Sequence, residues 1–201
     1  MAVYTKINKE NISYINKKFN IEKFISYKGI KQGIENTNYL LKTKKRKFIL
    51  TIFEKRVSNK ELPFFMELME VLNSSKINCP RPIKNKDENY LFKLKNKKAC
   101  IVTFLDGHDK KMLNIKNCYD VGKIIARMHL ITKNIKIFRK NSMGINNLNP
   151  LLKSIKFKKQ KFQNLDKFLK INLKDIKHKW PNILPKGIIH GDLFIDNIFF
   201  K

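Results

Sequence analysis

Cysteines and long hydrophobic runs are both scarce in this sequence. The three cysteines, Cys79, Cys100 and Cys118, form no C-x-x-C pair, so the sequence predicts neither a zinc site nor a disulfide framework. The run "ACIVTFL" is among the longest uninterrupted apolar stretches and is far too short to span a membrane. The opening "MAVYTKINKENISYINKK" lacks the apolar segment of a secretory signal. We therefore expect a soluble, untargeted protein in a reducing cytoplasm.

Acidic residues are also few, with 16 Asp and Glu against 44 Lys and Arg, which gives a net charge of +28. Such an excess usually suggests nucleic acid or an anionic membrane as partner. Here the surplus is nearly all lysine, scattered along the chain beside many Asn and Ile residues, whose codons are AT-rich. We interpret it as a solvated lysine-rich surface and expect no specific nucleic-acid or membrane partner. An anionic small molecule such as a nucleotide remains compatible with this charge.

Hydrophobic residues make up 42% of the chain, including fifteen Phe, which is enough for a packed core. Runs of β-branched and aromatic residues within 24–43, 48–53 and 90–107 predict strands joined by turns. Residues 62–72 instead have apolar side chains at helical spacing. Because the strands are local and enclose a single helix, we predict an antiparallel sheet and not a doubly wound parallel one.

The second half of the chain has the pattern of helices. Helices are predicted at 120–131 and around 165–173, and the polar segment 141–150 between them is predicted to be a turn-rich loop. The sequence thus predicts an α+β protein with two domains. Residues 1–105 form an N-terminal lobe with the sheet and one helix, and residues 106–201 form a helical lobe.

The segment "HGDLFIDN" contains the pattern H-x-D-x-x-x-x-N, which suits phosphoryl transfer. That reaction needs an acceptor hydroxyl to be positioned and its proton accepted, which Asp192 can do, and metal to neutralise the phosphates, which Asn197 can hold. Both side chains are predicted to project from one tight loop between buried apolar residues at 188–189 and 198–200. The alternative is a plain turn satisfied by the Asp and the Asn. On this segment alone the two interpretations have similar weight.

The order of the other features favours the catalytic interpretation. A kinase of the protein-kinase type needs a glycine turn between strands, a helix after the third strand, a connector after the fifth strand and then the catalytic loop. All of these occur here in that order. Each is weak alone: "GIKQG", with Gly29 and Gly33, is followed by no G-K-[ST] motif. Most strands like "IVTFLDG" are simply core.

Together these residues resemble the homoserine kinases of the aminoglycoside-phosphotransferase/choline-kinase type, which are relatives of the protein kinases. The resemblance covers essentially the entire chain. The segment "HGDLFIDN" is typical of the superfamily, while the series "FILTIFEKR", "LPFFMELME" and "CPRPI" is similar to homoserine kinases in particular. The resemblance implies a protein-kinase-like two-lobe fold.

The resemblance also implies the chemistry. The protein would use Mg²⁺ to transfer the γ-phosphoryl group of ATP to the side-chain hydroxyl of L-homoserine, a step of threonine biosynthesis. Asp192 would be the catalytic base and Asn197 a metal ligand. The residues that would bind the nucleotide are Gly29 and Gly33 at the phosphates and Thr103, Phe104 and Leu105 at the adenine.

The third strand departs from the pattern of most such kinases. The position where they have a lysine or arginine for the α- and β-phosphates is Thr51 here, and a hydroxyl supplies no cation. Lys55 or Arg56 just beyond the strand are candidates to replace it. The acidic residues that could orient the replacement are Glu61, Glu67 and Glu70.

The C-terminal end departs as well. Relatives place a second metal-binding aspartate on a strand shortly after the catalytic loop and then further helices, whereas this sequence stops at Lys201. We therefore expect a C-terminally truncated form with an incomplete helical lobe. We expect the 201 residues alone to have little or no turnover.

Two alternatives remain open. One keeps the reaction but changes the acceptor to choline, ethanolamine or an aminoglycoside, whose positive charge would need an acidic pocket. The other is a noncatalytic module that binds a nucleotide or nucleic acid, suggested by the net charge and the missing aspartate.

Overall fold

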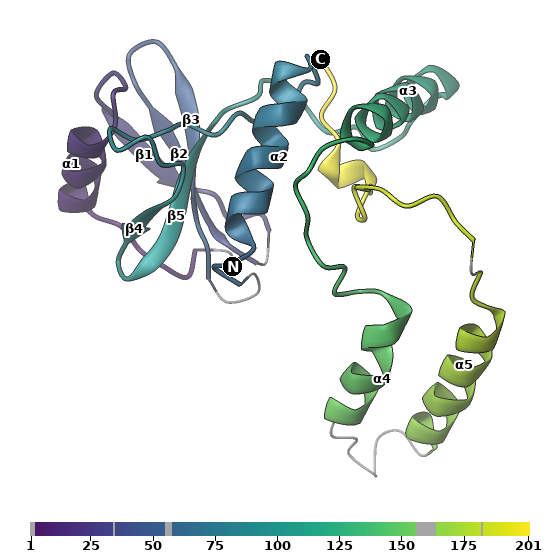
Figure 1. Cartoon of the computed structure of the whole chain (residues 1–201). Helices are drawn as coiled ribbons and strands as arrows, with labels where there is room; N and C mark the ends of the chain where they lie inside the picture. The colour runs from purple at the N-terminus through teal and green to yellow at the C-terminus, as the bar shows by residue number, and fades with distance from the viewer. Residues whose placement is uncertain (1–2, 34, 55–57, 156–163, 182) are drawn as a thin grey trace. The chain divides into compact units, whose positions relative to one another are not determined.

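The structure of the chain is a computed structural model that describes residues 3–33, 35–54, 58–155, 164–181 and 183–201. Five strands and five α-helices are present in this part, so the predicted α+β class is confirmed (Figure 1). The strands are β1 (Ser26–Gly29), β2 (Thr37–Lys42), β3 (Lys47–Ile52), β4 (Phe92–Leu94) and β5 (Lys97–Thr103). The helices are α1 (Lys9–Lys18), α2 (Leu62–Ser74), α3 (Ile115–Thr132), α4 (Ile145–Ser154) and α5 (Leu165–Lys179), and a short 3₁₀ turn follows at Ile195–Asn197.

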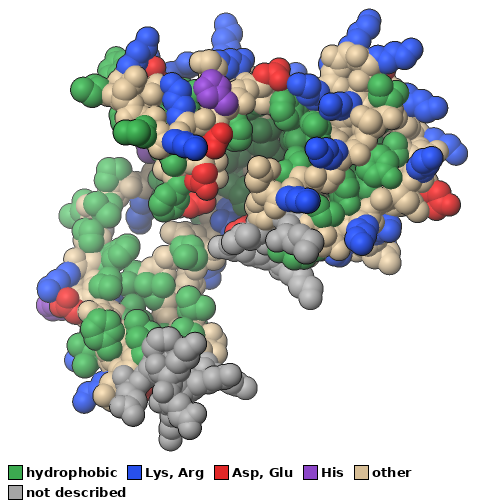
Figure 2. Space-filling model, turned by 180° about the vertical axis from the view of Figure 1, so that it is seen from behind, with side chains coloured by type: hydrophobic (Ala, Val, Ile, Leu, Met, Phe, Trp, Pro, Cys, Tyr) green, Lys and Arg blue, Asp and Glu red, His purple; other side chains and the backbone are tan. Residues whose placement is uncertain are grey.

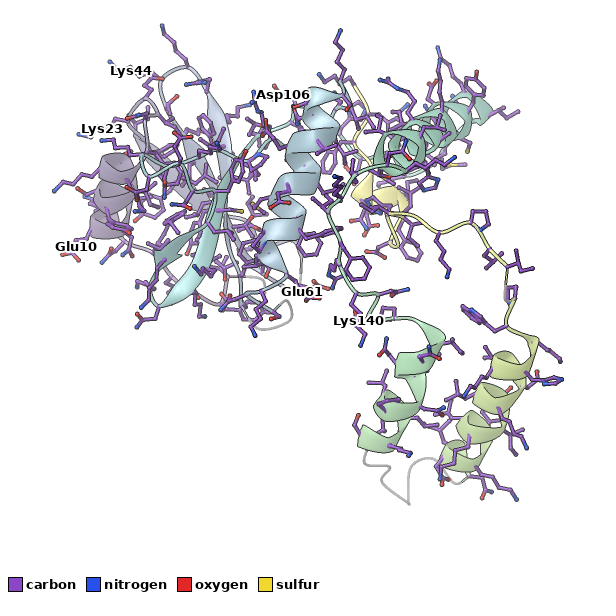
Figure 3. The ribbon with its side chains drawn as sticks, viewed as in Figure 1. Glu10, Lys23, Lys44, Glu61, Asp106 and Lys140 are labelled. Carbon is purple, nitrogen blue, oxygen red and sulfur yellow. The ribbon has the colours of Figure 1, made fainter. Side chains whose placement is uncertain are left out.

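The five strands form one sheet in the order β1-β2-β3-β5-β4, and every neighbouring pair is antiparallel, as predicted. Tight turns join β2 to β3 and β4 to β5, whereas β3 and β5 are neighbours across the intervening α2 and β4. The β4–β5 hairpin turns through Lys95 and Asn96, which both have positive φ, the geometry that tight two-residue hairpins require. At the β2–β3 turn, the Lys44 side chain extends away from the sheet (Figure 3). Strand β5 lies inside the sheet, so its C-terminal end leads from the core toward the second half of the chain.

One face of the sheet packs against α1, which lies on the opposite side from α2 (Figure 1). Helix α1 begins with a reciprocal capping box between Asn8 and Asn11, which satisfies two amide groups that the first turn leaves unpaired. Its apolar stripe supplies Ile12 and Ile15 to the main core. Alternate residues of the strands complete this core: Tyr39, Leu41, Phe48, Leu50, Ile52, Phe92, Leu94, Ala99 and Ile101.

The other face of the sheet packs against α2. Met66 of the helix is buried against Cys100 and Val102 of β5. Pro63 lies in the first turn of α2, where the missing N–H has no helical partner to lose. The predicted helix at 62–72 is therefore confirmed, and it places one layer of side chains over the β3–β5 region of the sheet.

The chain divides into two compact units, one of residues 1–137 with 188–201 and one of residues 138–187. In the first unit, Met128 of α3 packs with Leu72 and Ile77 at the end of α2. The second unit contains α4 and α5, which pack together. These units differ from the two lobes that we predict to meet at residue 105, and that boundary stays a prediction.

The prediction of a polar loop over 141–150 is wrong in its second half, because helix α4 begins at Ile145. Asn141 forms the turn before it: its side-chain oxygen accepts a hydrogen bond from the Met143 N–H, and its carbonyl accepts one from Asn147. Asn and Pro are poor helix formers, and Pro150 lies inside this helix. The contact with α5 overrides this local preference, which the polar composition could not reveal.

Among the described residues, no helix has both the length and the apolar composition that a membrane crossing would require.

Candidate active site

The predicted catalytic loop is held closed by its own side chains. The Asn197 amide nitrogen donates a hydrogen bond to the backbone carbonyl of Asp192 at 2.8 Å and another to the carboxylate Oδ2 of Asp192 at 3.0 Å. Gly191 has φ +78°, which lets the chain turn sharply before the aspartate. The two residues that the motif singled out therefore lie side by side, and both side chains are exposed to a ligand.

The orientation of Asn197 suits a metal. Because its amide nitrogen faces Asp192, its amide oxygen is directed elsewhere, and the oxygen is the atom that coordinates Mg²⁺. The described residues contain no group of three His, Cys, Asp or Glu side chains that could hold an ion by themselves. This donor set fits a Mg²⁺ ion that takes one or two ligands from the protein and others from the phosphates of a nucleotide.

The prediction that buried apolar residues flank the loop is wrong: Ile188, Ile198 and Phe200 are only half-buried, and the other two residues are exposed. Ile189 before the loop is 67% exposed, and Phe199 after it is 63% exposed. Within the loop Phe194 is also 67% exposed. The described residues pack against only part of this segment. An apolar side chain can be buried, but it becomes buried only where another part of the fold packs over it, and the sequence pattern does not show this.

The segment after the loop is fixed to the connector that follows β5. His108 and Phe200 exchange two backbone hydrogen bonds, of 3.0 and 2.9 Å. The Lys110 ammonium lies 4.7 Å from the centre of the Phe200 ring, within the range of a cation–π contact. The sequence did not reveal this pairing, because no periodic pattern links two short segments so far apart in the chain.

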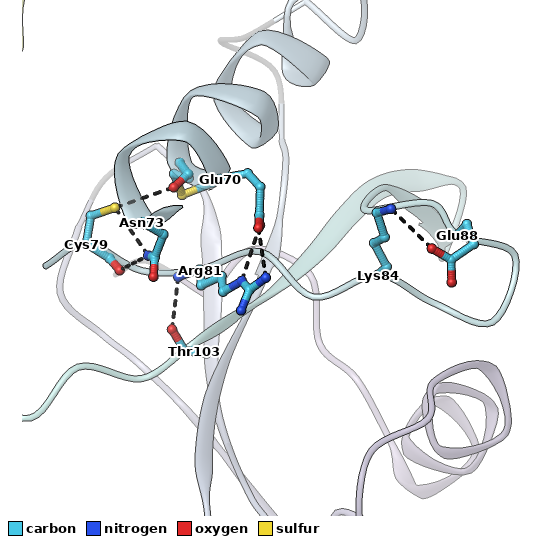
Figure 4. A network of polar contacts seen from close by, with 8 residues as sticks. Glu70, Asn73, Cys79, Arg81, Lys84, Glu88 and Thr103 are labelled. Carbon is cyan, nitrogen blue, oxygen red and sulfur yellow. Dashed lines mark hydrogen bonds and ion pairs between the residues drawn. The ribbon is translucent and has the colours of Figure 1, made fainter. Parts of the chain in front are cut away.

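The connector residues Thr103 and Phe104 use their N–H groups within the fold. The Thr103 N–H donates to the carbonyl of Arg81 at 2.9 Å, and the Phe104 N–H donates to the carbonyl of Lys47 at 3.3 Å. The Thr103 hydroxyl in turn accepts a hydrogen bond from the Arg81 N–H at 2.9 Å (Figure 4). For the N–H of Leu105 the described residues offer no partner. Of the three predicted adenine-contacting residues, Leu105 is thus the one with a donor left for a ligand.

Among the described residues, Glu70 of α2 has a cationic partner in Arg81. Its carboxylate binds the Arg81 guanidinium, with Nη2 at 2.8 Å and Nε at 3.4 Å (Figure 4). This pair ties α2 to the segment that runs beside the end of β5. The two candidate cations, Lys55 and Arg56, lie outside the described residues.

Thr51 occupies a neutral, hydrogen-bonded position on β3. Its hydroxyl donates to the side-chain oxygen of Asn38 on β2 at 2.8 Å. In the sheet Thr51 is paired with Cys100, which packs toward α2. The Thr51 hydroxyl therefore has its hydrogen-bond partner within the sheet.

The two predicted phosphate-binding glycines have different surroundings. Gly33 has φ +89° and no atom within 4 Å of the place where a Cβ would lie, so its conformation is what demands glycine. At Gly29 an added Cβ would lie 3.0 Å from the side chain of Val3. Close packing against the N-terminal segment therefore accounts for the absence of a side chain at Gly29.

Lys47 is a residue at the connector that sequence reasoning missed. Its ammonium lies 5.1 Å from the centre of the Phe104 ring and 3.4 Å from Oδ1 of Asp106. The Asp106 side chain is labelled in Figure 3. The excess of lysines hid this one, because nothing in its local sequence distinguishes it from the many solvated lysines. The contact places a positive charge beside the predicted adenine-binding strand.

A model of the phosphotransferase enzyme family matches residues 26–201. The chain is 40% identical over 202 residues to the homoserine kinase of Bradyrhizobium diazoefficiens and 37% identical over 205 residues to that of Parvibaculum lavamentivorans. Both matches cover 100% of this chain but only 62% and 63% of the relatives. The chain therefore spans less than two thirds of the length of these curated relatives.

Solved structures with the same fold are phosphotransferases and kinases. An amicoumacin kinase in complex with AMP-PNP, Ca²⁺ and Ami has a TM-score of 0.74 at 14% identity, with 97% of this chain and 61% of that chain covered. A spectinomycin phosphotransferase in complex with ADP and spectinomycin has a TM-score of 0.65 at 13% identity, with 98% and 66% covered. At these identities the likeness concerns the fold.

The antiparallel sheet with its α2 layer, followed by helices and an H-x-D-x-x-x-x-N loop, has the fold of these solved phosphotransferase and kinase structures. The chain belongs to the phosphotransferase enzyme family.

Proposed function

We propose that the protein containing this chain transfers the γ-phosphoryl group of ATP to the side-chain hydroxyl of L-homoserine, forming O-phospho-L-homoserine for threonine biosynthesis. The observation that carries the reaction is the exposed Asp192–Asn197 pair in one closed loop. The choice of homoserine rests on relatives of that name, which match every part of the chain.

Asp192 acts as the base. Phosphoryl transfer asks little covalent chemistry of the protein, so positioning the acceptor hydroxyl and accepting its proton are the main tasks of a side chain at this place. Asn197 keeps the loop closed through its amide nitrogen and offers its amide oxygen to the metal. When bound, Mg²⁺ neutralises charge on the phosphates.

The nucleotide binds at the sheet. Gly29 and Gly33 cover the phosphates, and residues 103–105 line the adenine, with the Leu105 N–H as the free donor. Figure 2 shows a recess with a hydrophobic floor on the face that it draws, and nucleotide and small-molecule sites are commonly recesses lined by apolar side chains. The mouth of the adenine site has a positive charge at Lys47.

The protein works in the cytoplasm with ATP and a small hydroxyl substrate, without nucleic acid or membrane. The three free cysteines among the described residues support a reducing compartment. The scattered Lys and Arg side chains on the face shown in Figure 2 support a generally solvated surface more than a defined nucleic-acid interface.

The test is phosphorus NMR of the purified protein with ATP, Mg²⁺ and L-homoserine. We expect the phosphomonoester signal of O-phospho-L-homoserine. Consumption of choline, ethanolamine or an aminoglycoside in place of homoserine would change the acceptor assignment. Steeply salt-dependent DNA or RNA binding without turnover would support a noncatalytic module.

Asp192→Asn tests the base. We expect it to lower kcat by about 10²- to 10⁴-fold, the usual contribution of a general base. Asp196→Asn is the matched control, because Asp196 is exposed in the same short turn and has no role in the proposed mechanism. Equal loss in both variants would point to general damage of the loop and not to loss of a base.

A further inference from the structure

We propose that Gly107 is a positioning residue for the catalytic loop. The absence of a side chain at Gly107 allows the segment that follows Asn197 to lie directly against the connector after β5. The inference rests on the proposed phosphotransfer, in which Asp192 and Asn197 act.

The contact at Gly107 leaves less room than nine in ten real Cβ atoms have. A Cβ at this position would lie 3.1 Å from the Cβ of Phe199 and 3.1 Å from the carbonyl oxygen of Phe200. Ordinary van der Waals contacts of a Cβ begin near 3.4 Å, so one of the two segments must shift by a few tenths of an ångström. Neither opposing atom can turn away, because one is a backbone atom and the other is attached directly to the backbone.

The backbone of Gly107 is not itself unusual. Its φ lies outside the left-handed region, so alanine can adopt the same backbone conformation without strain. Close approach alone therefore explains the need for glycine. This distinguishes Gly107 from Gly33 and Gly191, whose positive φ requires glycine for conformational reasons.

Several interactions fix the approach. His108 and Phe200 exchange backbone hydrogen bonds in both directions. Lys110 contacts the Phe200 ring and also donates to the side-chain oxygen of Asn117 at 3.3 Å. Asn117 is buried in the first turn of α3 as part of its capping box. The segment at 199–200 is thereby bound both to the connector and, through Lys110, to the start of α3.

The approach matters for chemistry because Asn197 is separated from Phe199 only by Ile198. Its side chain is hydrogen-bonded to Asp192, so a shift at 199–200 moves both residues together relative to the connector that bears the nucleotide. Phosphoryl transfer depends on alignment to well below an ångström. A side chain at position 107 would therefore disturb the alignment of the catalytic loop with the nucleotide, although it removes no group that takes part in the reaction.

The experiment compares Gly107→Ala with Gly122→Ala in the protein that contains this chain. Gly122 lies in α3 with no atom within 4 Å of its Cβ position, so the same chemical change is made there without a collision. We expect Gly107→Ala to lower kcat at least tenfold and to raise the Mg²⁺ concentration for half-maximal rate. Its affinity for a fluorescent ATP analogue should stay within about twofold, and Gly122→Ala should match the unmodified protein throughout.

A second variant covers the case in which Gly107→Ala fails to fold. Lys110→Met keeps an unbranched side chain that is one atom shorter, and it removes the charge that contacts Phe200 and Asn117. It should lower kcat several-fold and shift the Mg²⁺ requirement in the same direction. Unchanged kcat and Mg²⁺ dependence in either folded variant would overturn the proposal.

A readout independent of turnover separates this proposal from the proposed function. In ¹⁵N-edited NMR spectra, Gly107→Ala should shift the side-chain amide signal of Asn197, and Gly122→Ala should leave it in place. If the unmodified protein phosphorylates no acceptor, the proposed function fails while this spectral comparison still decides whether Gly107 sets the loop. An unmoved Asn197 signal would refute the positioning role.

Discussion

Glu54 shows how a single charged residue can tie distant segments together. Its side chain is 10% exposed and is paired with Lys97 of β5. The hydroxyls of Thr5 and Thr37 donate to the same carboxylate at 2.8 and 2.6 Å. Burial raises the pKa of Glu54, but the hydrogen bonds from Lys97, Thr37 and Thr5 lower it more, so the pKa lies below the ordinary value of 4.5. The charged carboxylate thus stabilises the folded state.

Replacing this carboxylate should destabilise the first unit in a pH-dependent way. We expect Glu54→Gln to lower the free energy of unfolding by about 1–3 kcal/mol at pH 7, because a nearly buried charge-assisted network is lost. Since the folded pKa is depressed, the contribution is fully present above the unfolded pKa and is lost as pH falls through the folded pKa. The difference between the two proteins should therefore shrink below pH 4.5.

Urea denaturation at pH 7 and at pH 3.5 measures this difference. Glu67→Gln is the control, because Glu67 is exposed on α2 and exposed substitutions usually change stability by less than about 0.5 kcal/mol. A difference for Glu54→Gln that is the same at both pH values would contradict the assignment of the network.

Residue patterns predicted which polar side chains lie together in the loop, but they did not predict what surrounds them. The spacing of Asp192 and Asn197 within eight letters was enough to place them in one loop, because a short loop brings its own residues together. Lys47 and the Glu54 network escaped prediction, because their partners come from other strands. The exposure of Ile189 and Phe199 was missed for the same reason.

Among the helices and strands, those whose apolar residues recur at regular spacing were predictable from the sequence. The sheet strands and α2 followed their patterns because each buries one apolar face, and that face appears as periodic spacing in the sequence whichever element covers it. Helix α4 was not predictable, since Asn and Pro residues favour turns locally. Its formation depends on α5, which provides the surface on which it packs.

The proline inside α4 should make this helix less stable than the same helix with alanine at that position. Pro150 removes a helical hydrogen bond, and an interior proline costs about 3 kcal/mol relative to alanine. We expect Pro150→Ala to slow hydrogen exchange of the α4 amides by about tenfold or more. Pro63→Ala in α2 is the matched control and should have little effect on α2, because Pro63 lies in the first turn.

Mass spectrometry with peptide resolution over α4 and α2 reads out both variants. Unchanged hydrogen exchange of the α4 amides in Pro150→Ala would contradict this prediction. It would mean that packing alone sets the stability of α4.

At the scale of the whole molecule, two modes of ATP binding must be distinguished: nonspecific attraction to a strongly positive surface and binding at a specific nucleotide site. The net charge of +28 attracts any anion, whereas the proposed site needs an adenine at the connector and phosphates with Mg²⁺. A ligand that binds only the folded state stabilises it by about 2.7 kcal/mol at a hundred times its Kd. ATP should therefore act as a specific stabiliser of the protein.

We expect ATP with Mg²⁺ to raise the Tm by about 5–10 °C at saturating concentration. Pyrophosphate with Mg²⁺ should raise it much less, because it lacks the base that residues 103–105 would bind. Differential scanning fluorimetry measures both shifts. Equal shifts by ATP and pyrophosphate would indicate general anion binding to the lysines in place of a nucleotide site.

The sequence by itself determined the α+β class, the antiparallel sheet and the closeness of Asp192 and Asn197 in one loop. These features depend on hydrophobic periodicity and on short spacing in the chain, which are local properties. Only the tertiary structure decided what surrounds them. It placed Gly107 against residues 199–200 and paired Glu70 with Arg81, and it left the Leu105 N–H without a partner among the described residues. These depend on segments brought together by the folding of the whole unit, and no local pattern records which distant neighbour a residue will meet.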